Sequence, residues 1–483
     1  MLLLTVAALL STSAQIVGLG GQVGTGPPSP STTATAVAPA AWRTFDEPPE
    51  RSPSTRPPTP SGLVVACDEA VHDETAASRC LGALGSAPPD AVARTAAATD
   101  DTGAAAAGLA AALAPRLEAR RTAEWWAALP PDRRDLLVDV VPGLVGNLEG
   151  LPYADRAVAN QRQLTTVLGA TAARLGTDRE RDDDAARLAM LQQVLRSVQD
   201  RSSGWADRSL VAFDPVLPGR AAVSVGDLDE ADDVTVLVPG MLFTVTGQLV
   251  DWSETAGHVQ QEEATWSQRL DPGDGPGAGT AVVAWMGYRT PDLTNFSTLD
   301  LARTGAGQLE DALLGLDAAR AGAPARVTVV AHSYGSTTST LTLSSGRVTV
   351  DSLVVLGSPG SVVGRASELA VRHADVYAAA GSFDPVAGSA FFGADPAVAA
   401  FGGVVLHTGG AVDPVTRVRL GAALGHNDYL LPGTETVRDI ALVALGRGDL
   451  VGRPSTAPTG PDQPRHGPPG LTLVRPQELW PRD

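Results

Sequence analysis

The chain of 483 residues contains no lysine, since all 36 of its basic side chains are arginine. This absence excludes three enzyme classes that need a lysine at a fixed position. A P-loop requires a lysine that reaches the phosphates, pyridoxal phosphate requires one for its Schiff base, and protein kinases require one on a strand. Any catalysis must therefore come from other side chains.

Positive charge is also scarce, because 54 acidic residues oppose the 36 arginines and give a net charge of −18. Such a chain repels a phosphate backbone and an anionic lipid surface. No stretch interleaves basic with aromatic residues, and no histidine pair has a zinc-binding spacing such as H-E-x-x-H. The sequence predicts no nucleic-acid partner, no metal and no cofactor.

Cysteine is limited to Cys67 and Cys80, which lie thirteen positions apart. In a protein outside the cytoplasm the two could form a disulfide, which for so short a loop would contribute about 3 kcal/mol. Two buried thiols are the alternative. Neither cysteine follows a strand on a turn, so we expect no catalytic role for them.

The first 24 residues carry no charge, and residues 2–10 (LLLTVAALL) have the length of the apolar core of a signal peptide. Small residues follow and suit cleavage before Gln15. No basic residue precedes the apolar run, so an uncleaved membrane anchor and a misplaced start codon are the alternatives. We expect residues 1–24 to be a signal peptide or an anchor, and the protein to be secreted or extracytoplasmic.

Composition divides the rest of the chain into four regions. Residues 25–62 and 453–483 are rich in Pro, Ser and Thr and are expected to be disordered. Good helix formers predict a helical N-terminal region over residues 63–205, in which the acidic triplet 182–184 should be a solvated helix start. Residues 206–452 are expected to form a second region of a different class.

That second region alternates short β-branched runs with stretches of helical length. Runs such as VTVLVPG, AVVAWMGY, RVTVVAHS and SLVVLGSPG predict a mostly parallel sheet covered by helices on both faces, which is an α/β fold. The first two runs, SLVAFD and AAVSVGD, lie close together. They predict an antiparallel hairpin at one edge.

Ser333 stands where one of these runs stops and a helix-compatible stretch begins, in the sequence AHSYG. This matches the nucleophile elbow G-x-S-x-G, with Ala331 in place of the first glycine and Gly335 in place of the second. The elbow should present the serine hydroxyl to solvent at the carboxyl edge of the sheet, where ligands bind in such folds. An ordinary strand-to-helix turn is the alternative interpretation.

A serine nucleophile needs an imidazole base and a carboxylate that orients the imidazole, in the chain order Ser, acid, His. Asp384 follows a predicted strand in AAAGSFDPV, and His426 lies in a polar turn in LGHNDY. Asp413 also follows a strand and is the main competitor for the role of the acid. The remaining histidines fit local or core positions better.

The oxyanion of the transition state needs preorganised N–H donors. One should be the backbone N–H of Tyr334, directly after the nucleophile. The other should come from the loop after the strand VTVLV, where Met241 follows a Pro-Gly pair.

Taken in order, VTVLVPGM, VVAWMGY, VVAHSYGS, LVVLGSPG, GSFDPV and GHNDY resemble an actinobacterial α/β-hydrolase family of unknown function with a GHSYGS elbow. The helical stretch EWWAALPPDRRDLLVDVVPGLVGNLEGLPYADRAVAN resembles the segment that precedes the sheet in that family. The similarity extends roughly from Arg121 to Arg447. It implies an α/β-hydrolase fold and the triad Ser333, Asp384 and His426, but no substrate.

These features predict a secreted serine hydrolase of esterase or lipase type that acts on small-molecule or lipid-like esters through an acyl-enzyme. An acyltransferase with the same triad and a catalytically silent binding module are the alternatives. Within the helical region, GNLEGLPYADR could cover the mouth of the active site or simply separate two helices.

Overall fold

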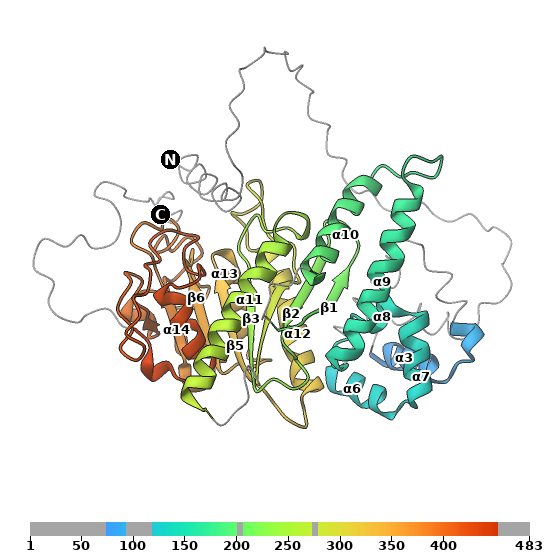
Figure 1. Ribbon diagram of the computed structural model, residues 1–483, viewed down its shortest axis with the longest axis horizontal. Helices are drawn as coiled ribbons and strands as arrows, with labels where there is room; N and C mark the ends of the chain where they lie inside the picture. Colours follow the sequence, from blue (N-terminus) through green and yellow to red (C-terminus); the bar gives the residue numbers. More distant parts are fainter. Residues whose placement is uncertain (1–73, 93–117, 200–205, 273–278, 453–483) are drawn as a thin grey trace, which may run out of the picture.

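A computed structural model describes residues 74–92, 118–199, 206–272 and 279–452 (Figure 1). The predicted N-terminal segment, linker and tail lie outside the described residues, and so does Cys67. Cys80 is buried in helix α3. Because its possible partner Cys67 is not described, the disulfide stays a prediction. No helix of the described ranges is long and apolar enough to cross a membrane.

Eight strands form one sheet in the order β1-β2-β4-β3-β5-β6-β7-β8. β2 runs antiparallel to both β1 and β4, and all the other neighbours are parallel. The predicted mostly parallel sheet and its antiparallel edge hairpin are both confirmed. The strands are β1 Arg208–Asp214, β2 Arg220–Val225, β3 Asp233–Val238, β4 Thr280–Met286, β5 Arg326–His332, β6 Ser352–Leu356, β7 Val376–Ala379 and β8 Val404–Val405.

The register aligns the carboxyl ends of the central strands. The last residue of β3, Val238, pairs with Ala331 of β5, and His332 pairs with Leu356 of β6. Leu356 in turn pairs with Ala379, the last residue of β7. The loops that leave these four strands therefore start side by side at one edge of the sheet.

Helices cover both faces, as Figure 1 shows. α11 and α14 pack on one face together with α9 and α10, whereas α12 and α13 pack on the other. The helices are α9 Tyr153–Arg174, α10 Asp184–Gln199, α11 Val245–Leu270, α12 Asp300–Ala319, α13 Tyr334–Ser344 and α14 Glu435–Ala444, and short 3-10 turns are η2 Ala366–Glu368, η3 Arg372–Ala374, η4 Ala399–Phe401 and η5 Gly448–Leu450.

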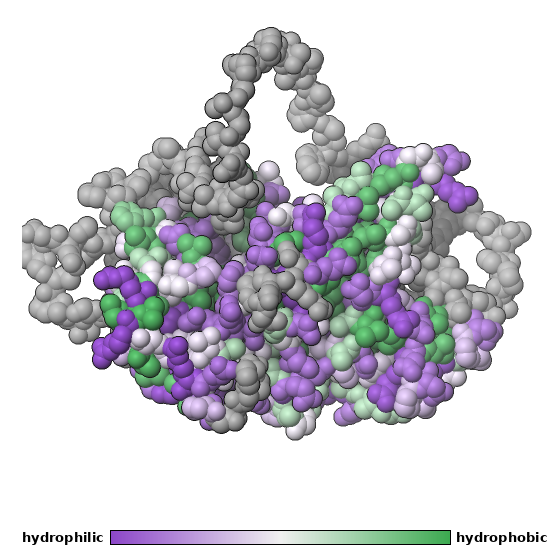
Figure 2. Space-filling model, viewed as in Figure 1, coloured by the Kyte–Doolittle hydropathy of each residue, from purple (hydrophilic) through white to green (hydrophobic). Residues whose placement is uncertain are grey.

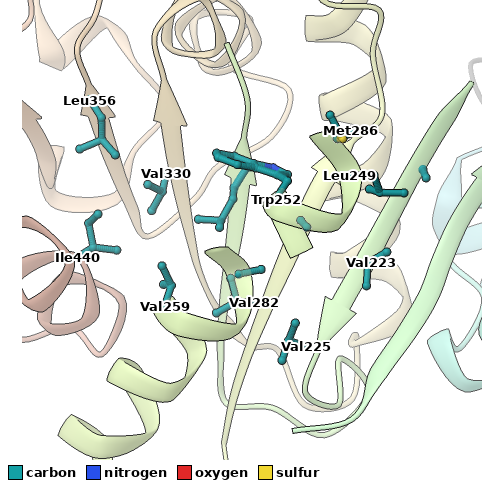
Figure 3. Packing of buried hydrophobic residues seen from close by; sticks show 14 of the residues in the cluster. Val223, Val225, Leu249, Trp252, Val259, Val282, Met286, Val330, Leu356 and Ile440 are labelled. Atoms are coloured by element: carbon teal, nitrogen blue, oxygen red, sulfur yellow. The ribbon is translucent and has the colours of Figure 1, made fainter. Parts of the chain in front are cut away.

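Trp252 of α11 lies in the hydrophobic core between the sheet and the helices α9, α10, α11 and α14 (Figure 3). Its ring is buried in the same cluster as Val330 of β5 and Leu356 of β6, and its Nε1–H donates to the carbonyl oxygen of Leu237 at 3.3 Å. Strands covered on both faces are apolar on both faces, which explains their continuous β-branched runs. Burial of one such large side chain stabilises the fold by about 1.5–3 kcal/mol.

The N-terminal helices have a small core of their own. They are α3 Glu74–Ser86, α6 Ala119–Ala128, α7 Pro131–Val140 and α8 Pro142–Val145, and they lie beside the β1 edge of the sheet (Figure 1). On the face that Figure 2 shows, hydrophobic residues gather in patches among hydrophilic ones.

The segment GNLEGLPYADR contains the connection from α8 to α9 and the first turn of α9. The side chain of Asn147 donates to the carbonyl oxygen of Phe213 in β1, and the backbone N–H of Tyr153 donates to Asp229, which precedes β3. Three strands separate β1 from β5, which ends directly before Ser333. These contacts favour the interpretation of this segment as a helix separator.

The acidic triplet differs from expectation at its last member. Asp184 is fully buried and forms an ion pair with Arg174, at 2.6 Å between Oδ1 and Nη2. Because α9 and α10 pack against each other, the carboxylate faces the neighbouring helix instead of solvent. The prediction of a solvated triplet was therefore wrong for this residue.

Candidate active site

Ser333 occupies a sharp turn between β5 and α13. Its backbone has φ 54° and ψ −128°, a left-handed conformation that is uncommon for a residue with a Cβ. Strain of this kind gathers at functional sites and persists where the surrounding structure holds it. The strand-to-helix context thus produces the geometry of a nucleophile elbow.

The hydroxyl is less accessible than the sequence predicts, because only 4% of Ser333 is exposed. The loop after β3 passes directly over it: a Cβ added to Gly240 would lie 2.7 Å from the Cβ of Ser333. A Cβ on Gly335 would lie 2.5 Å from the carbonyl oxygen of Pro239. Glycine is therefore required at both positions, and Ala331 fits without exposure.

His426 connects Ser333 to Asp384 through its two ring nitrogens. Its Nε2 lies 2.9 Å from the Oγ of Ser333, and its Nδ1 lies 2.9 Å from both carboxylate oxygens of Asp384. A carboxylate can only accept, so Nδ1–H donates to it and Nε2 is left free to accept the serine proton. The structure thus brings together the three side chains that the sequence nominated.

The environment of Asp384 keeps its carboxylate charged. Burial opposes ionisation, but the hydrogen bond and charge interaction with His426 and the hydrogen bonds from the Tyr429 hydroxyl and the Val386 N–H outweigh it and lower the pKa of Asp384 to about 2. The Tyr429 hydroxyl donates to Oδ2 at 2.6 Å and accepts from the N–H of Gly381 at 2.7 Å. Asp384 is therefore ionised throughout the neutral range.

Asp413, the competing acid, lies elsewhere. Its Oδ2 forms an ion pair with the Nε of Arg438 at 2.7 Å, and its Oδ1 accepts from the backbone N–H groups of Val415 and Thr416. It caps a turn and neutralises a buried arginine. No hydrogen bond joins it to His426 within the described residues.

His332, directly before the nucleophile, supports the histidine loop. Its Nε2 lies 2.7 Å from the backbone carbonyl oxygen of His426, so Nε2–H must donate. Burial and then the neighbouring His426 lower the pKa of His332 to about 3, which keeps this imidazole neutral. The bond spans 94 positions along the chain, so it ties the base to the elbow and goes beyond a local contact.

Three hydrogen bonds from the segment after β4 hold the loop that covers Ser333. The hydroxyl of Tyr288 donates to the carbonyl oxygen of Pro239 at 2.7 Å. The hydroxyl of Thr290 donates to the carbonyl oxygen of Phe243 at 2.6 Å. Between them, the N–H of Leu242 donates to the carbonyl oxygen of Pro291 at 2.9 Å. Leu242 has φ 65°, which costs a leucine roughly 1–2 kcal/mol.

The two nominated oxyanion donors flank the nucleophile. Met241 follows Gly240 in the covering loop, and its N–H donates to no acceptor among the described residues. Tyr334 is the first residue of α13, where an N–H has no intrahelical acceptor. Both N–H groups can donate to a ligand oxygen. Their role as oxyanion donors stays a prediction.

Within the described ranges, no group of three or more His, Cys, Asp or Glu side chains is arranged to hold a metal ion. The arrangement of Ser333, His426 and Asp384 suits nucleophilic attack by the serine with the histidine as base.

Two residues of the candidate active site were not predicted from the sequence. Tyr429 lies within the nominated stretch GHNDY, yet nothing along the chain shows that its hydroxyl reaches Asp384. Gly357 has φ 59°, and a Cβ there would lie 2.7 Å from Asp384 Oδ2 and 3.0 Å from His426 Nδ1. In the sequence, the position of Gly357 directly after the strand in VVLGSPG is the feature that could have indicated this close approach.

Known proteins resemble the chain over this region. A family model described as "Alpha/beta hydrolase" matches residues 214–394, which include Ser333 and Asp384. The uncharacterized protein Rv2079 of Mycobacterium tuberculosis is 30% identical over 401 residues, which cover 72% of this chain and 59% of that protein. The uncharacterized protein Rv0963c of the same organism is 32% identical over 197 residues, which cover 40% of this chain and 73% of that protein.

The chain thus spans 59% of the length of the first of these relatives. A solved structure titled "Structure of arylesterase" aligns with this chain at 8% sequence identity and a TM-score of 0.29. The alignment covers 59% of this chain and 98% of the chain in that structure. Similarity at that level does not bear on function.

Proposed function

The chain belongs to an actinobacterial α/β-hydrolase family of unknown function and has the α/β-hydrolase fold, and from this premise we propose that it is a serine hydrolase that cleaves carboxylic esters. We further propose that the protein is exported, because its first 24 residues combine an apolar run with an absence of charge. The observation that carries the catalytic proposal is the placement of His426 between Ser333 and Asp384.

In the acylation step, the Oγ of Ser333 attacks the ester carbonyl carbon while Nε2 of His426 takes the hydroxyl proton. Asp384, already ionised, keeps the Nδ1–H tautomer and stabilises the imidazolium that forms. The carbonyl oxygen becomes an oxyanion that accepts from the N–H groups of Met241 and Tyr334. Collapse of this intermediate breaks the ester bond, and His426 returns the proton to the leaving alcohol.

In the deacylation step, a water molecule takes the place of the alcohol. His426 removes one proton from it, and the hydroxide attacks the acyl carbon of the Ser333 ester. The carboxylic acid leaves, and the proton on His426 returns to Ser333. His332 supports both steps indirectly, because its bond to the carbonyl oxygen of His426 holds the base in reach of the serine.

A fluorophosphonate probe tests this proposal directly, because it reacts only with an activated serine hydroxyl. We expect covalent labelling at Ser333, located by mass spectrometry of tryptic peptides. Prior heat denaturation should abolish labelling. A folded protein that does not react would instead be a silent binding module.

Activity should rise with pH. The base accepts the serine proton only when it is neutral, whereas Asp384, with its pKa of about 2, and His332, with its pKa of about 3, change no charge near neutrality. We therefore expect kcat/KM for p-nitrophenyl acetate to increase from about pH 5 to about pH 8 and to follow a single protonation. A flat profile over this range would count against His426 as the base.

A further inference from the structure

A cleft of about 560 Å³ opens beside the covering loop of the candidate active site. Its walls are mainly apolar and come from α10, from the turn between β1 and β2, and from the loops that follow β3 and β4. The apolar wall residues include Ala186, Ala189, Leu217, Phe243, Met286 and Tyr288. The charged residues of its lining are Arg289 and Asp292. A volume of this size is typical of sites for small apolar ligands.

The cleft and the nucleophile share one loop. Gly240 lies over Ser333, Met241 provides a candidate oxyanion donor, and Leu242 already lines the cleft. Tyr288 bridges the two places, because its ring lines the cleft while its hydroxyl donates to the carbonyl oxygen of Pro239. The loop therefore runs from the nucleophile to the wall of the cleft.

The order of the strands decides which half of an ester would point there. Asp384 and His426 follow β7 and β8 on one side of β5, whereas the cleft lies at the ends of β3 and β4 on the other side. The alcohol must leave on the side of His426, because that imidazole protonates it. The acyl group on the same carbon would then point away from His426, toward the ends of β3 and β4.

We propose that this cleft is the acyl-chain site and that the substrates are esters of medium-chain and long-chain fatty acids. The assignment rests on the proposed ester hydrolysis. An uncharged alkyl chain suits the walls, and each methylene that it buries should raise kcat/KM about fourfold until the cleft is filled. The bracing of the loop by Tyr288 and Thr290 keeps the cleft aligned with the nucleophile.

Two alanines on α10 provide a matched test. Ala189 is exposed and lines the cleft, whereas Ala185, on the same helix, is exposed and does not line it. Ala189→Phe should lower kcat/KM for p-nitrophenyl decanoate roughly tenfold and change that for p-nitrophenyl acetate by less than about twofold. Ala185→Phe should leave both values within about twofold, and both variants should keep the thermal transition of the parent protein.

Direct binding separates this assignment from the catalytic proposal. Calorimetry with decanoate should show a Kd for Ala189→Phe roughly tenfold above that of the parent protein and of Ala185→Phe, whether or not any ester is turned over. Loss of ester turnover together with this pattern of binding would overturn only the catalytic proposal. Equal decanoate affinity in all three proteins, or a parallel loss of acetate and decanoate turnover in Ala189→Phe, would overturn the acyl-chain site.

Discussion

Replacement of Ser333 by alanine should lower kcat for p-nitrophenyl acetate by roughly 10⁴- to 10⁶-fold, because no other group can form the acyl-enzyme. The substitution removes one hydroxyl, whose hydrogen bond to His426 Nε2 contributes about 1 kcal/mol. The thermal transition should therefore shift only slightly. Initial rates and a melting curve on the same preparation measure both quantities.

Ser339 offers a matched control, since it is a buried serine on α13 whose hydroxyl has no hydrogen-bond partner among the described residues. Ser339→Ala should keep full activity. If Ser333→Ala were as active as Ser339→Ala, the covalent mechanism would have to be abandoned.

Replacement of Asp384 by asparagine should lower kcat on the order of 10⁴-fold with the fold retained. The amide of asparagine can donate to Nδ1 of His426 and so favours the tautomer that carries its proton on Nε2. That nitrogen then cannot accept the proton of Ser333, although the geometry is nearly unchanged.

Asp413→Asn should show the opposite pattern. Asp413 forms an ion pair with Arg438, whose side chain is 3% exposed, so removal of the negative charge leaves a buried positive charge with less compensation. We expect a lower melting temperature and a kcat near that of the parent protein in the folded fraction. The reverse order of the two kcat values would assign the acid to Asp413 and leave the roles of Ser333 and His426 intact.

Much of the arrangement could be predicted because its signals are local. The β-branched runs predict strands, and the change from RVTVVAH to YGSTTST marks the strand-to-helix junction at Ser333. The chain order of serine, acid and histidine limits the partners to a few residues. It does not choose between Asp384 and Asp413, since each follows a strand and precedes a proline.

Predictions failed where a residue depends on parts of the chain far away in sequence. Asp184 belongs to an acidic run that is typical of a solvated helix start, yet Arg174 on the preceding helix buries it. Ser333 was expected in solvent, yet the loop at Gly240 covers it. In both cases the local pattern predicts the element correctly, whereas the packing of a second element decides the exposure.

The sequence by itself determined the absence of lysine chemistry, the class of the fold and the position of the elbow, because each depends on composition or on residues within one strand and one helix. Only the tertiary structure decided which carboxylate reaches His426, and that Tyr429 contacts Asp384 while His332 contacts the backbone of His426. It also decided where a cleft opens beside the loop that covers Ser333. The bonds from His426 to Asp384 and to Ser333 span 42 and 93 positions. Such distances are set by the order and register of the strands, and no local pattern contains them.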